Sequence, residues 1–213
     1  MKQILCYGDS NTWGHDPDWA EGKELRYPYE VRWPGCLEGL LGTEYRVISE
    51  GLCARSTSYD DPVDVGKNGL ACYPVCYESA MPVEWVVLML GTNDVRPVFH
   101  APPQEIVRGM ERLGILTERI SRECGRITPK ILIIAPVPVA ETAEEGDLAG
   151  IYDRTSVQKS RELAALYKTM AKRHGWEFLD ANTCAPQLGK DGVHLTADGH
   201  RRLAEAVCNI IKG

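Results

Sequence analysis

Four short stretches of the chain place nucleophilic, basic or hydrogen-bonding side chains beside glycine or other small residues. They are residues 8–11 (GDSN), 50–57 (EGLCARST), 91–94 (GTND) and 191–194 (DGVH). Ser10 directly follows an apolar run, so it can lie at the end of a buried strand, in a tight turn that Gly8 allows. A serine hydroxyl becomes an effective nucleophile only when an adjacent base takes its proton. Ser10 therefore requires a histidine within reach and an acceptor that orients this histidine.

The chain has five histidines, which are His15, His100, His174, His194 and His200. His194 stands apart because Asp191 precedes it by three residues across a glycine, so one short loop can supply both the base and the carboxylate that orients it. An Asp-x-x-His alone is more often a capped turn. His15 and His100 lie in expected loops and are weaker competitors. His174 and His200 lie in helical patterns and are expected to be surface or packing residues.

Acyl transfer also needs hydrogen-bond donors for the oxyanion of a tetrahedral intermediate. Asn93 can present its side-chain amide, and the backbone amides of residues 50–57 can point to the same pocket rim. Each stretch alone is equally compatible with an ordinary turn or connection. Their combination with Ser10 and His194 is what favours acyl-transfer chemistry.

Five short aliphatic or β-branched runs are predicted to be buried strands. They cover residues 3–7, 45–48, 85–90, 130–135 and 176–179. Helical spacing is expected for Leu37, Leu40 and Leu41, for Ile106, Met110, Leu113, Leu116 and Ile120, for Leu163, Leu166, Tyr167, Met170 and Ala171, and for Leu203, Ala206, Val207, Ile210 and Ile211. This alternation predicts right-handed crossovers, and hence a three-layer α/β/α sandwich around a five-stranded parallel sheet.

Residues 54–82 and 136–152 are predicted to be irregular, because they are rich in turn-forming residues. Ligands of open parallel sheets bind beyond the carboxyl ends of the strands, so both stretches are expected to form walls of a pocket. The length of 213 residues favours one domain over residues 1–213 and one active site.

Composition excludes several classes of function. A formal net charge of −6 offers no basic surface for nucleic acid, and no apolar run is long enough to cross a membrane. Neither a P-loop nor G-x-G-x-x-G follows the first strand, so no nucleotide or other cofactor is expected. The first strand begins almost at Met1, which leaves no room for an export signal and favours a cytosolic protein. The sequence leaves open whether the protein forms a homo-oligomer.

The chain has eight cysteines, and in a cytosolic protein they are expected to be reduced, most of them as small buried side chains. Cys72 and Cys76 are the closest pair, but no second pair follows at the spacing of a zinc ribbon. No bound metal is therefore expected.

Taken in order, the four stretches resemble the blocks of the SGNH hydrolases, and this resemblance covers nearly the whole chain. The G-x-S-x-G elbow of the α/β-hydrolases does not occur around Ser10. The resemblance implies that Ser10 is the nucleophile, His194 the general base and Asp191 its orienter. It also implies an oxyanion hole formed by the amide of Ser10, the amide of Ala54 and the side chain of Asn93.

This chain departs from the family pattern at three positions. Asn11 stands where the family commonly has leucine, Ala54 where it commonly has glycine, and Glu50 where many members have asparagine. Because a backbone amide serves equally well from alanine, the departure at Ala54 affects the alignment more than the chemistry.

Residues 4–14, 50–57, 60–62, 68–69 and 89–94 are most similar to the arylesterase/acyltransferase branch of this family. That likeness implies hydrolysis of small acyl esters, of acetyl or aryl type, with acyl transfer to alcohols as an additional activity and Trp13 in the substrate pocket. Trp13 is equally compatible with packing of the first turn against the sheet. The alternatives are a carbohydrate or thioester deacylase with the same site, and a non-catalytic small-ligand binder with a flavodoxin-like sandwich.

Overall fold

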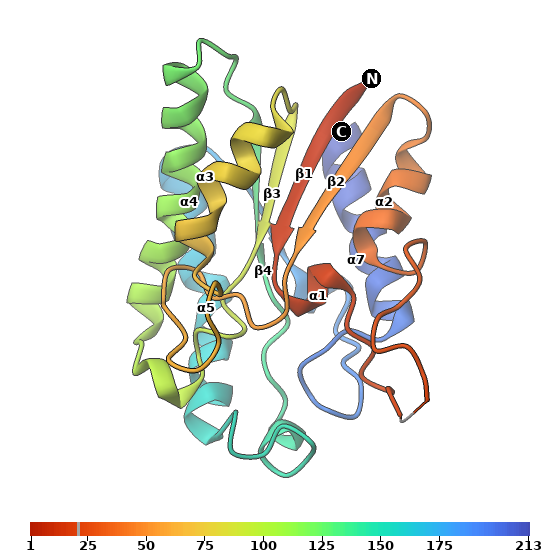
Figure 1. Cartoon of the computed structure of the whole chain (residues 1–213), viewed down its shortest axis with the longest axis vertical. Coiled ribbons are helices and arrows are strands. Elements are labelled where there is room, and N and C mark those ends of the chain that lie inside the picture. Colours follow the sequence, from red (N-terminus) through yellow and green to blue (C-terminus); the bar gives the residue numbers. More distant parts are fainter. Residues whose placement is uncertain (21) are drawn as a thin grey trace.

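The structure, a computed structural model, describes residues 1–20 and 22–213. Its sheet has five parallel strands, which are β1 (Lys2–Gly8), β2 (Tyr45–Gly51), β3 (Trp85–Met89), β4 (Lys130–Ala135) and β5 (Glu177–Asp180). They lie side by side in the order β2-β1-β3-β4-β5 (Figure 1). The parallel five-stranded sheet predicted from the sequence is confirmed, and β2 continues three residues further than expected.

Helices cover both faces of the sheet, which confirms the three-layer sandwich. One layer is formed by α3 (Gly69–Ala80), α4 (Pro103–Glu123) and α5 (Arg154–His174), and the other by α2 (Trp33–Leu41) and α7 (Ala197–Lys212) (Figure 1). The shorter segments are α1 (Ser10–Trp13), α6 (Ala181–Cys184) and the 3₁₀ turns Pro97–Phe99 and Glu141–Glu144. Among the helices of the described residues, none is both long and apolar enough to span a membrane.

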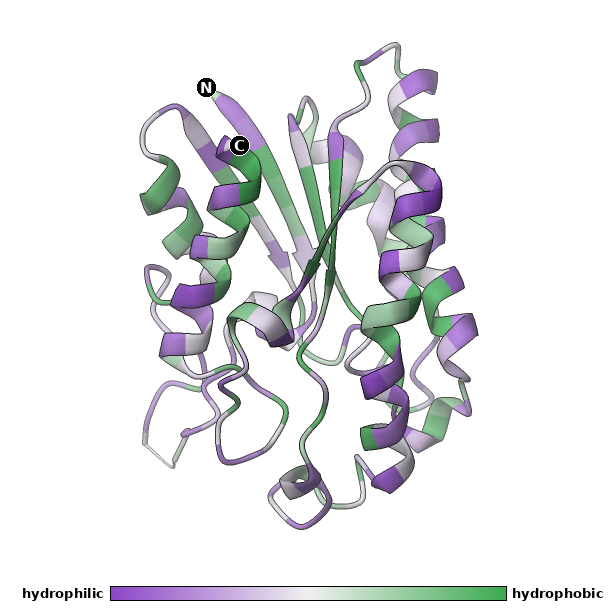
Figure 2. Ribbon diagram, turned by 180° about the vertical axis from the view of Figure 1, so that it is seen from behind, coloured by the Kyte–Doolittle hydropathy of each residue, from purple (hydrophilic) through white to green (hydrophobic). Residues whose placement is uncertain are grey.

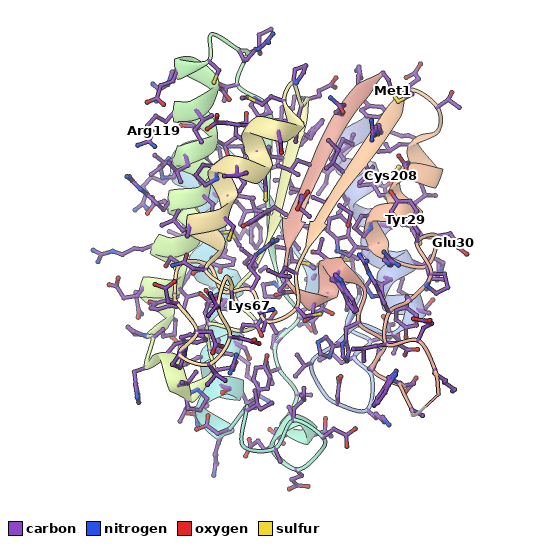
Figure 3. The ribbon with its side chains drawn as sticks, viewed as in Figure 1. Met1, Tyr29, Glu30, Lys67, Arg119 and Cys208 are labelled. Atoms are coloured by element: carbon purple, nitrogen blue, oxygen red, sulfur yellow. The ribbon has the colours of Figure 1, made fainter. Side chains whose placement is uncertain are left out.

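Successive side chains of each strand pack alternately into the two apolar cores, one on each face of the sheet. In β1, Leu5 and Tyr7 pack toward α3, α4 and α5, whereas Ile4 and Cys6 pack toward α2 and α7. Figure 2 shows the same division by hydropathy, with green strands between helices whose polar residues lie outside. Arg119 of α4, for example, points away from the sheet (Figure 3). The strands therefore form a rigid platform that is buried on both faces.

Two expectations from the sequence are wrong. Within residues 54–82, predicted to be irregular, lies α3, which is capped by the Asn68 side chain and contains Pro74 in its interior. Proline removes a backbone donor and lowers helix propensity, but burial of Tyr73 and Tyr77 against the sheet outweighs this cost. Most cysteines are also not buried. All eight are free, yet only Cys6 and Cys208 are buried.

The strand order determines where a ligand can bind. The chain leaves β1 for β2 on one side and then returns past β1 to β3, so the direction of winding reverses between β1 and β3. In parallel sheets the crevice outside the carboxyl ends of such strands is the usual binding site. Both chain termini lie at the opposite end of the sheet (Figure 1).

Candidate active site

Ser10 is the first residue of α1, immediately beyond β1. The Asp9 carboxylate caps this helix by accepting a hydrogen bond from the Asn11 amide at 3.0 Å. The helix packs so closely on β2 that a Cβ atom at Gly51 would lie 2.1 Å from the Trp13 nitrogen. Glycine at position 51 therefore lets the Ser10 backbone settle against the sheet edge.

Ser10, His194 and Asp191 form a connected triad. The Ser10 Oγ lies 2.8 Å from His194 Nε2, and His194 Nδ1 lies 2.6 Å from Asp191 Oδ2. The other Asp191 oxygen accepts from the backbone amides of Val193 and His194. Burial raises the pKa of Asp191, but hydrogen bonds from His194 and the two amides outweigh this effect and hold that pKa below its usual value. Asp191 is thus an ionised acceptor that fixes the imidazole.

Asn11, where the family commonly has leucine, connects the serine helix to the histidine loop. Its side-chain amide donates to the Val193 carbonyl at 3.2 Å, and its oxygen accepts from the Leu195 amide at 2.8 Å. Both residues that flank His194 are therefore held by one buried side chain. No pattern in the sequence indicates this role, because the bonded groups are 182 and 184 residues apart.

Asn93 follows β3 and is held from two sides. Its Nδ2 donates to the Arg55 carbonyl at 3.0 Å, and its Oδ1 accepts from the Tyr152 hydroxyl at 3.2 Å. A primary amide has two N–H groups, so one remains for a ligand. Tyr152 comes from the predicted pocket wall at residues 136–152, which thus orients a group at the site.

Ala54 has a positive φ of 64°, an unusual conformation for a residue other than glycine. This explains why glycine suits the position. The buried Arg55 side chain next to it donates to the Gly8 carbonyl at 2.9 Å and also to the Glu50 carbonyl. Arg55 therefore ties the ends of β1 and β2 together beneath the Ala54 turn. The Ser10 amide, in the first turn of α1, has no acceptor within its own helix.

Two further carboxyl groups lie fully buried below the site. Asp94 accepts from the Thr57 amide at 2.8 Å and from the Thr57 hydroxyl at 2.5 Å, which joins the loop after β3 to the loop after β2. Burial raises the pKa of Asp94 to about 6 and that of Asp9 to about 6. The sequence carries no sign of this link, because Thr57 and Asp94 are 37 residues apart.

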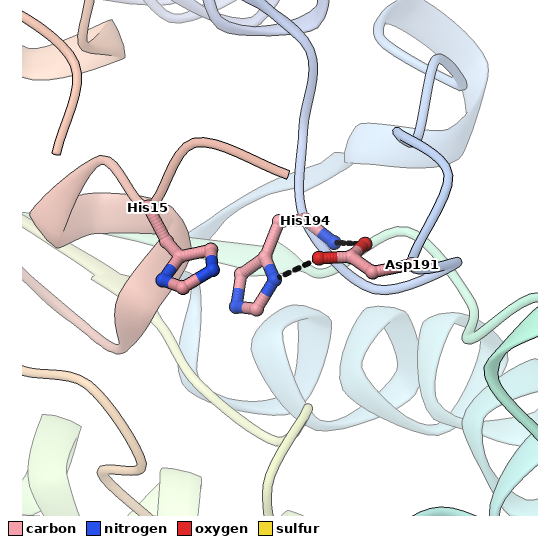
Figure 4. Close-up of side chains that lie close together, drawn as sticks. All are labelled: His15, Asp191 and His194. Atoms are coloured by element: carbon pink, nitrogen blue, oxygen red, sulfur yellow. Dashed lines mark hydrogen bonds and ion pairs between the residues drawn. The ribbon is translucent and has the colours of Figure 1, made fainter. Parts of the chain in front are cut away.

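His15, a weaker competitor in the sequence, lies directly against the triad. Its ring stacks on that of His194, with centroids 4.0 Å apart and planes at 29° (Figure 4). Burial, and then the electrostatic influence of the neighbouring His194 ring, lower the pKa of His15 to about 4, so it is neutral at pH 7. His200 is a buried packing residue, as expected, and its Nδ1 accepts from the Trp33 amide.

Trp13 ends α1 and is half-buried. The Arg26 guanidinium lies 4.6 Å from the centre of its ring, and Arg26 Nε donates to the Trp13 carbonyl at 2.7 Å. Trp13 lies three residues after Ser10, at the other end of the same short helix. Its assignment to the substrate pocket stays a prediction.

Comparisons with known proteins identify the family of this chain. The GDSL-like lipase/acylhydrolase family model matches residues 6–202. A carbohydrate acetylesterase from Sinorhizobium meliloti is 40% identical, with a TM-score of 0.89, and the match covers 100% of this chain and 99% of that one. An aryl esterase from M. smegmatis is 34% identical, with a TM-score of 0.92 and the same coverage. A search of curated proteins found no significant match.

A lipase/acylhydrolase from Enterococcus faecalis is 20% identical with a TM-score of 0.68, covers 100% of this chain and 96% of that one, and supports the fold alone. The family match and the two more similar esterases extend across both ends of the site, from the strand before Ser10 to the helix after His194. The chain belongs to the GDSL-like lipase/acylhydrolase family and is a carboxylic ester hydrolase.

Proposed function

We propose that the protein hydrolyses small acyl esters, of acetyl or aryl type, through an acyl-enzyme formed on Ser10. The observation that carries this proposal is the unbroken chain of hydrogen bonds from Ser10 Oγ through His194 to Asp191. In such an arrangement the histidine removes the serine proton while the carboxylate holds the correct tautomer.

In the first step, Ser10 Oγ attacks the ester carbonyl and His194 Nε2 takes its proton. The charged Asp191 stabilises the resulting imidazolium. The carbonyl oxygen becomes an oxyanion, and the donors proposed for it are the Ser10 amide, the Ala54 amide and the second N–H of Asn93. When the tetrahedral intermediate collapses, His194 returns the proton to the leaving alcohol, and the acyl group remains on Ser10.

In the second step, His194 activates water or another alcohol for attack on the acyl-enzyme. If Trp13 and the loop of residues 54–68 form an apolar wall, an organic alcohol gains about 0.8 kcal/mol for each buried methylene. Acyl transfer then competes with hydrolysis. Similarity to a carbohydrate acetylesterase favours acetylated sugars as a second substrate class for the same site.

The test uses p-nitrophenyl acetate and the full chain. A burst of nitrophenol, equal in amount to the enzyme, and acetyl recovered on the Ser10 peptide are expected. A linear time course with no acetylated peptide during steady turnover argues against an accumulating acyl-enzyme.

A second experiment adds increasing butanol to the same reaction to test acyl transfer. The ratio of butyl acetate to acetate formed should exceed the mole ratio of butanol to water. If butyl acetate only follows this mole ratio, the enzyme is a hydrolase without preferential transfer to alcohols.

A further inference from the structure

His15 gives the site a second imidazole that the proposed reaction does not use. One ligand atom each from His15, Asp191 and His194 lies within 4.8 Å of the other two (Figure 4). Within the described part of the chain, no other group of three or more His, Cys, Asp or Glu side chains comes this close. The pair Cys72 and Cys76 belongs to no such group.

We propose that His15 and His194 form a binding site for a divalent transition-metal cation of the Zn²⁺ type, and that the bound ion inhibits the enzyme by occupying the nitrogen that serves Ser10. The inhibition rests on the proposed function, whereas the binding itself does not.

The ligand chemistry favours such a cation. Asp191 accepts from Nδ1 of His194 at 2.6 Å, which leaves Nε2 as the nitrogen with a lone pair. Metal-binding histidines usually donate their other nitrogen to a carboxylate in this way, and the carboxylate makes the imidazole a better ligand. The same Nε2 lies 2.8 Å from Ser10 Oγ, so it cannot hold a cation and accept the serine proton at once.

A shared ion requires the His15 ring to turn out of its stack on His194, because the lone pair of each ring nitrogen lies in the plane of its ring. Two nitrogens on one tetrahedral Zn²⁺ lie about 3.3 Å apart, given Zn–N distances of about 2.0–2.1 Å. The His15 backbone is fixed, because its amide donates to the Ser10 carbonyl at 3.0 Å and it pairs with Arg26. Its imidazole, in contrast, is half-buried and has no hydrogen bond to any described residue. Rotation of this side chain can bring its nitrogen to a shared ion.

The surrounding charges are mixed. Burial and then the neighbouring His194 disfavour positive charge at His15, whereas the carboxylates of Asp191 and Asp16 favour it. The guanidinium of Arg26, whose backbone pairs with His15, is engaged by the Trp13 carbonyl and ring. A hard cation such as Mg²⁺ prefers oxygen ligands and is not expected to bind.

The experiment titrates Zn²⁺ against the esterase rate and, separately, against the protein in a calorimeter without substrate. Wild type should be inhibited reversibly, with recovery on addition of EDTA and no effect of Mg²⁺. His15→Phe keeps an aromatic ring on His194 but removes the ligand. With each rate expressed relative to the metal-free rate of the same protein, this variant should need at least about tenfold more Zn²⁺ for half-inhibition than wild type. Its calorimetric titration should show one Zn²⁺ site fewer than that of wild type. His15→Gln provides a second variant, and His100→Asn is the control for a histidine elsewhere.

Equal inhibition of wild type and both His15 variants overturns the proposal. So does inhibition that disappears when Cys72 and Cys76 are replaced by serine, since the metal then acts at thiols. If the protein proves to have no esterase activity but calorimetry still shows one site that depends on His15, the proposed function fails while the metal site stands.

Discussion

Asn11 holds the residues on both sides of His194, although it touches neither Ser10 Oγ nor the imidazole by a side-chain hydrogen bond. In Asn11→Leu the side chain has a similar volume but makes neither hydrogen bond, so His194 should no longer be held in position against Ser10. We expect kcat to fall by about 10- to 100-fold with little change in KM, because small misplacements of catalytic groups have effects of this size. Steady-state kinetics with p-nitrophenyl acetate measure this.

Asn11→Asp is the matched control, since its carboxylate still accepts from Leu195 but cannot donate to Val193. It should retain more activity than Asn11→Leu. If a folded Asn11→Leu enzyme keeps the wild-type kcat, Asn11 does not position the histidine.

Asn93→Ala should lower kcat by about 10²- to 10³-fold, the usual loss for one oxyanion donor. Tyr152→Phe leaves the Asn93 amide in place and removes only the hydrogen bond to its oxygen, so its loss should be smaller. Measured kcat values for the two variants check this order. A larger loss in Tyr152→Phe than in Asn93→Ala would assign the donor role to the tyrosine.

The sequence identifies the residues whose partners are close along the chain or whose motif is recognisable. Asp191 and His194 share one loop, and Ser10 directly follows a strand. Asn11 and His15 were not identified as contacts of this loop, because each meets it across some 180 residues of chain. Spacing along one strand or helix carries no information about such contacts.

At the scale of elements, the packing of α1 on β2 should be essential. Gly51→Ala places a Cβ atom against the Trp13 backbone, which cannot yield as a flexible side chain would. We expect a destabilisation of about 1–3 kcal/mol and a lower kcat, since α1 carries Ser10.

Gly39→Ala is the control for Gly51→Ala. Gly39 lies in the interior of α2 and is exposed, and a Cβ atom there meets no other atom within 4 Å. Alanine should therefore stabilise the protein by about 0.5–1 kcal/mol and leave kcat unchanged. Chemical denaturation and kinetics test the pair, and equal effects of the two variants would contradict close packing of α1.

Strongly periodic elements were predicted well. The four helices with regular apolar spacing and all five strands are confirmed, because their sequences carry one clear period each. Helix α3 was missed because Pro74 and Gly69 indicate a break. The spacing of Leu70, Tyr73, Tyr77 and Ala80 was the available sign of a buried helical face.

For the whole molecule, burial and then the electrostatic influence of His194 and Arg32 lower the pKa of His200 to about 3. In the unfolded chain its pKa is about 6.5. Between these values the unfolded state binds more protons, so this group's contribution to stability is complete above pH 6.5 and is lost as the pH falls toward 3. Asp9 and Asp94, whose pKa values are raised to about 6, act in the opposite direction.

One variant separates the effect of His200 on the pH dependence of stability from the effect of the carboxyl groups. His200→Asn keeps an acceptor for the Trp33 amide but does not titrate. Between pH 7 and pH 5 wild type should lose about 2 kcal/mol more of its unfolding free energy than the variant does. Urea denaturation at both pH values measures the difference, and parallel pH profiles would show that His200 does not titrate as described.

Three expectations for the whole protein stay predictions. They are that residues 1–213 act as a single domain, that the protein is cytosolic, and that it can form a homo-oligomer. The family model spans residues 6–202, which is consistent with one catalytic unit over most of the chain.

The central claim is that Ser10 is the nucleophile, and covalent labelling tests it most directly. A serine-reactive phosphonate should add one equivalent to the wild-type protein, with the modification on the Ser10 peptide by mass spectrometry and loss of esterase activity in proportion. Folded Ser10→Ala should take up no label and hydrolyse no ester. Labelling at another serine, or undiminished turnover by Ser10→Ala, would contradict the account.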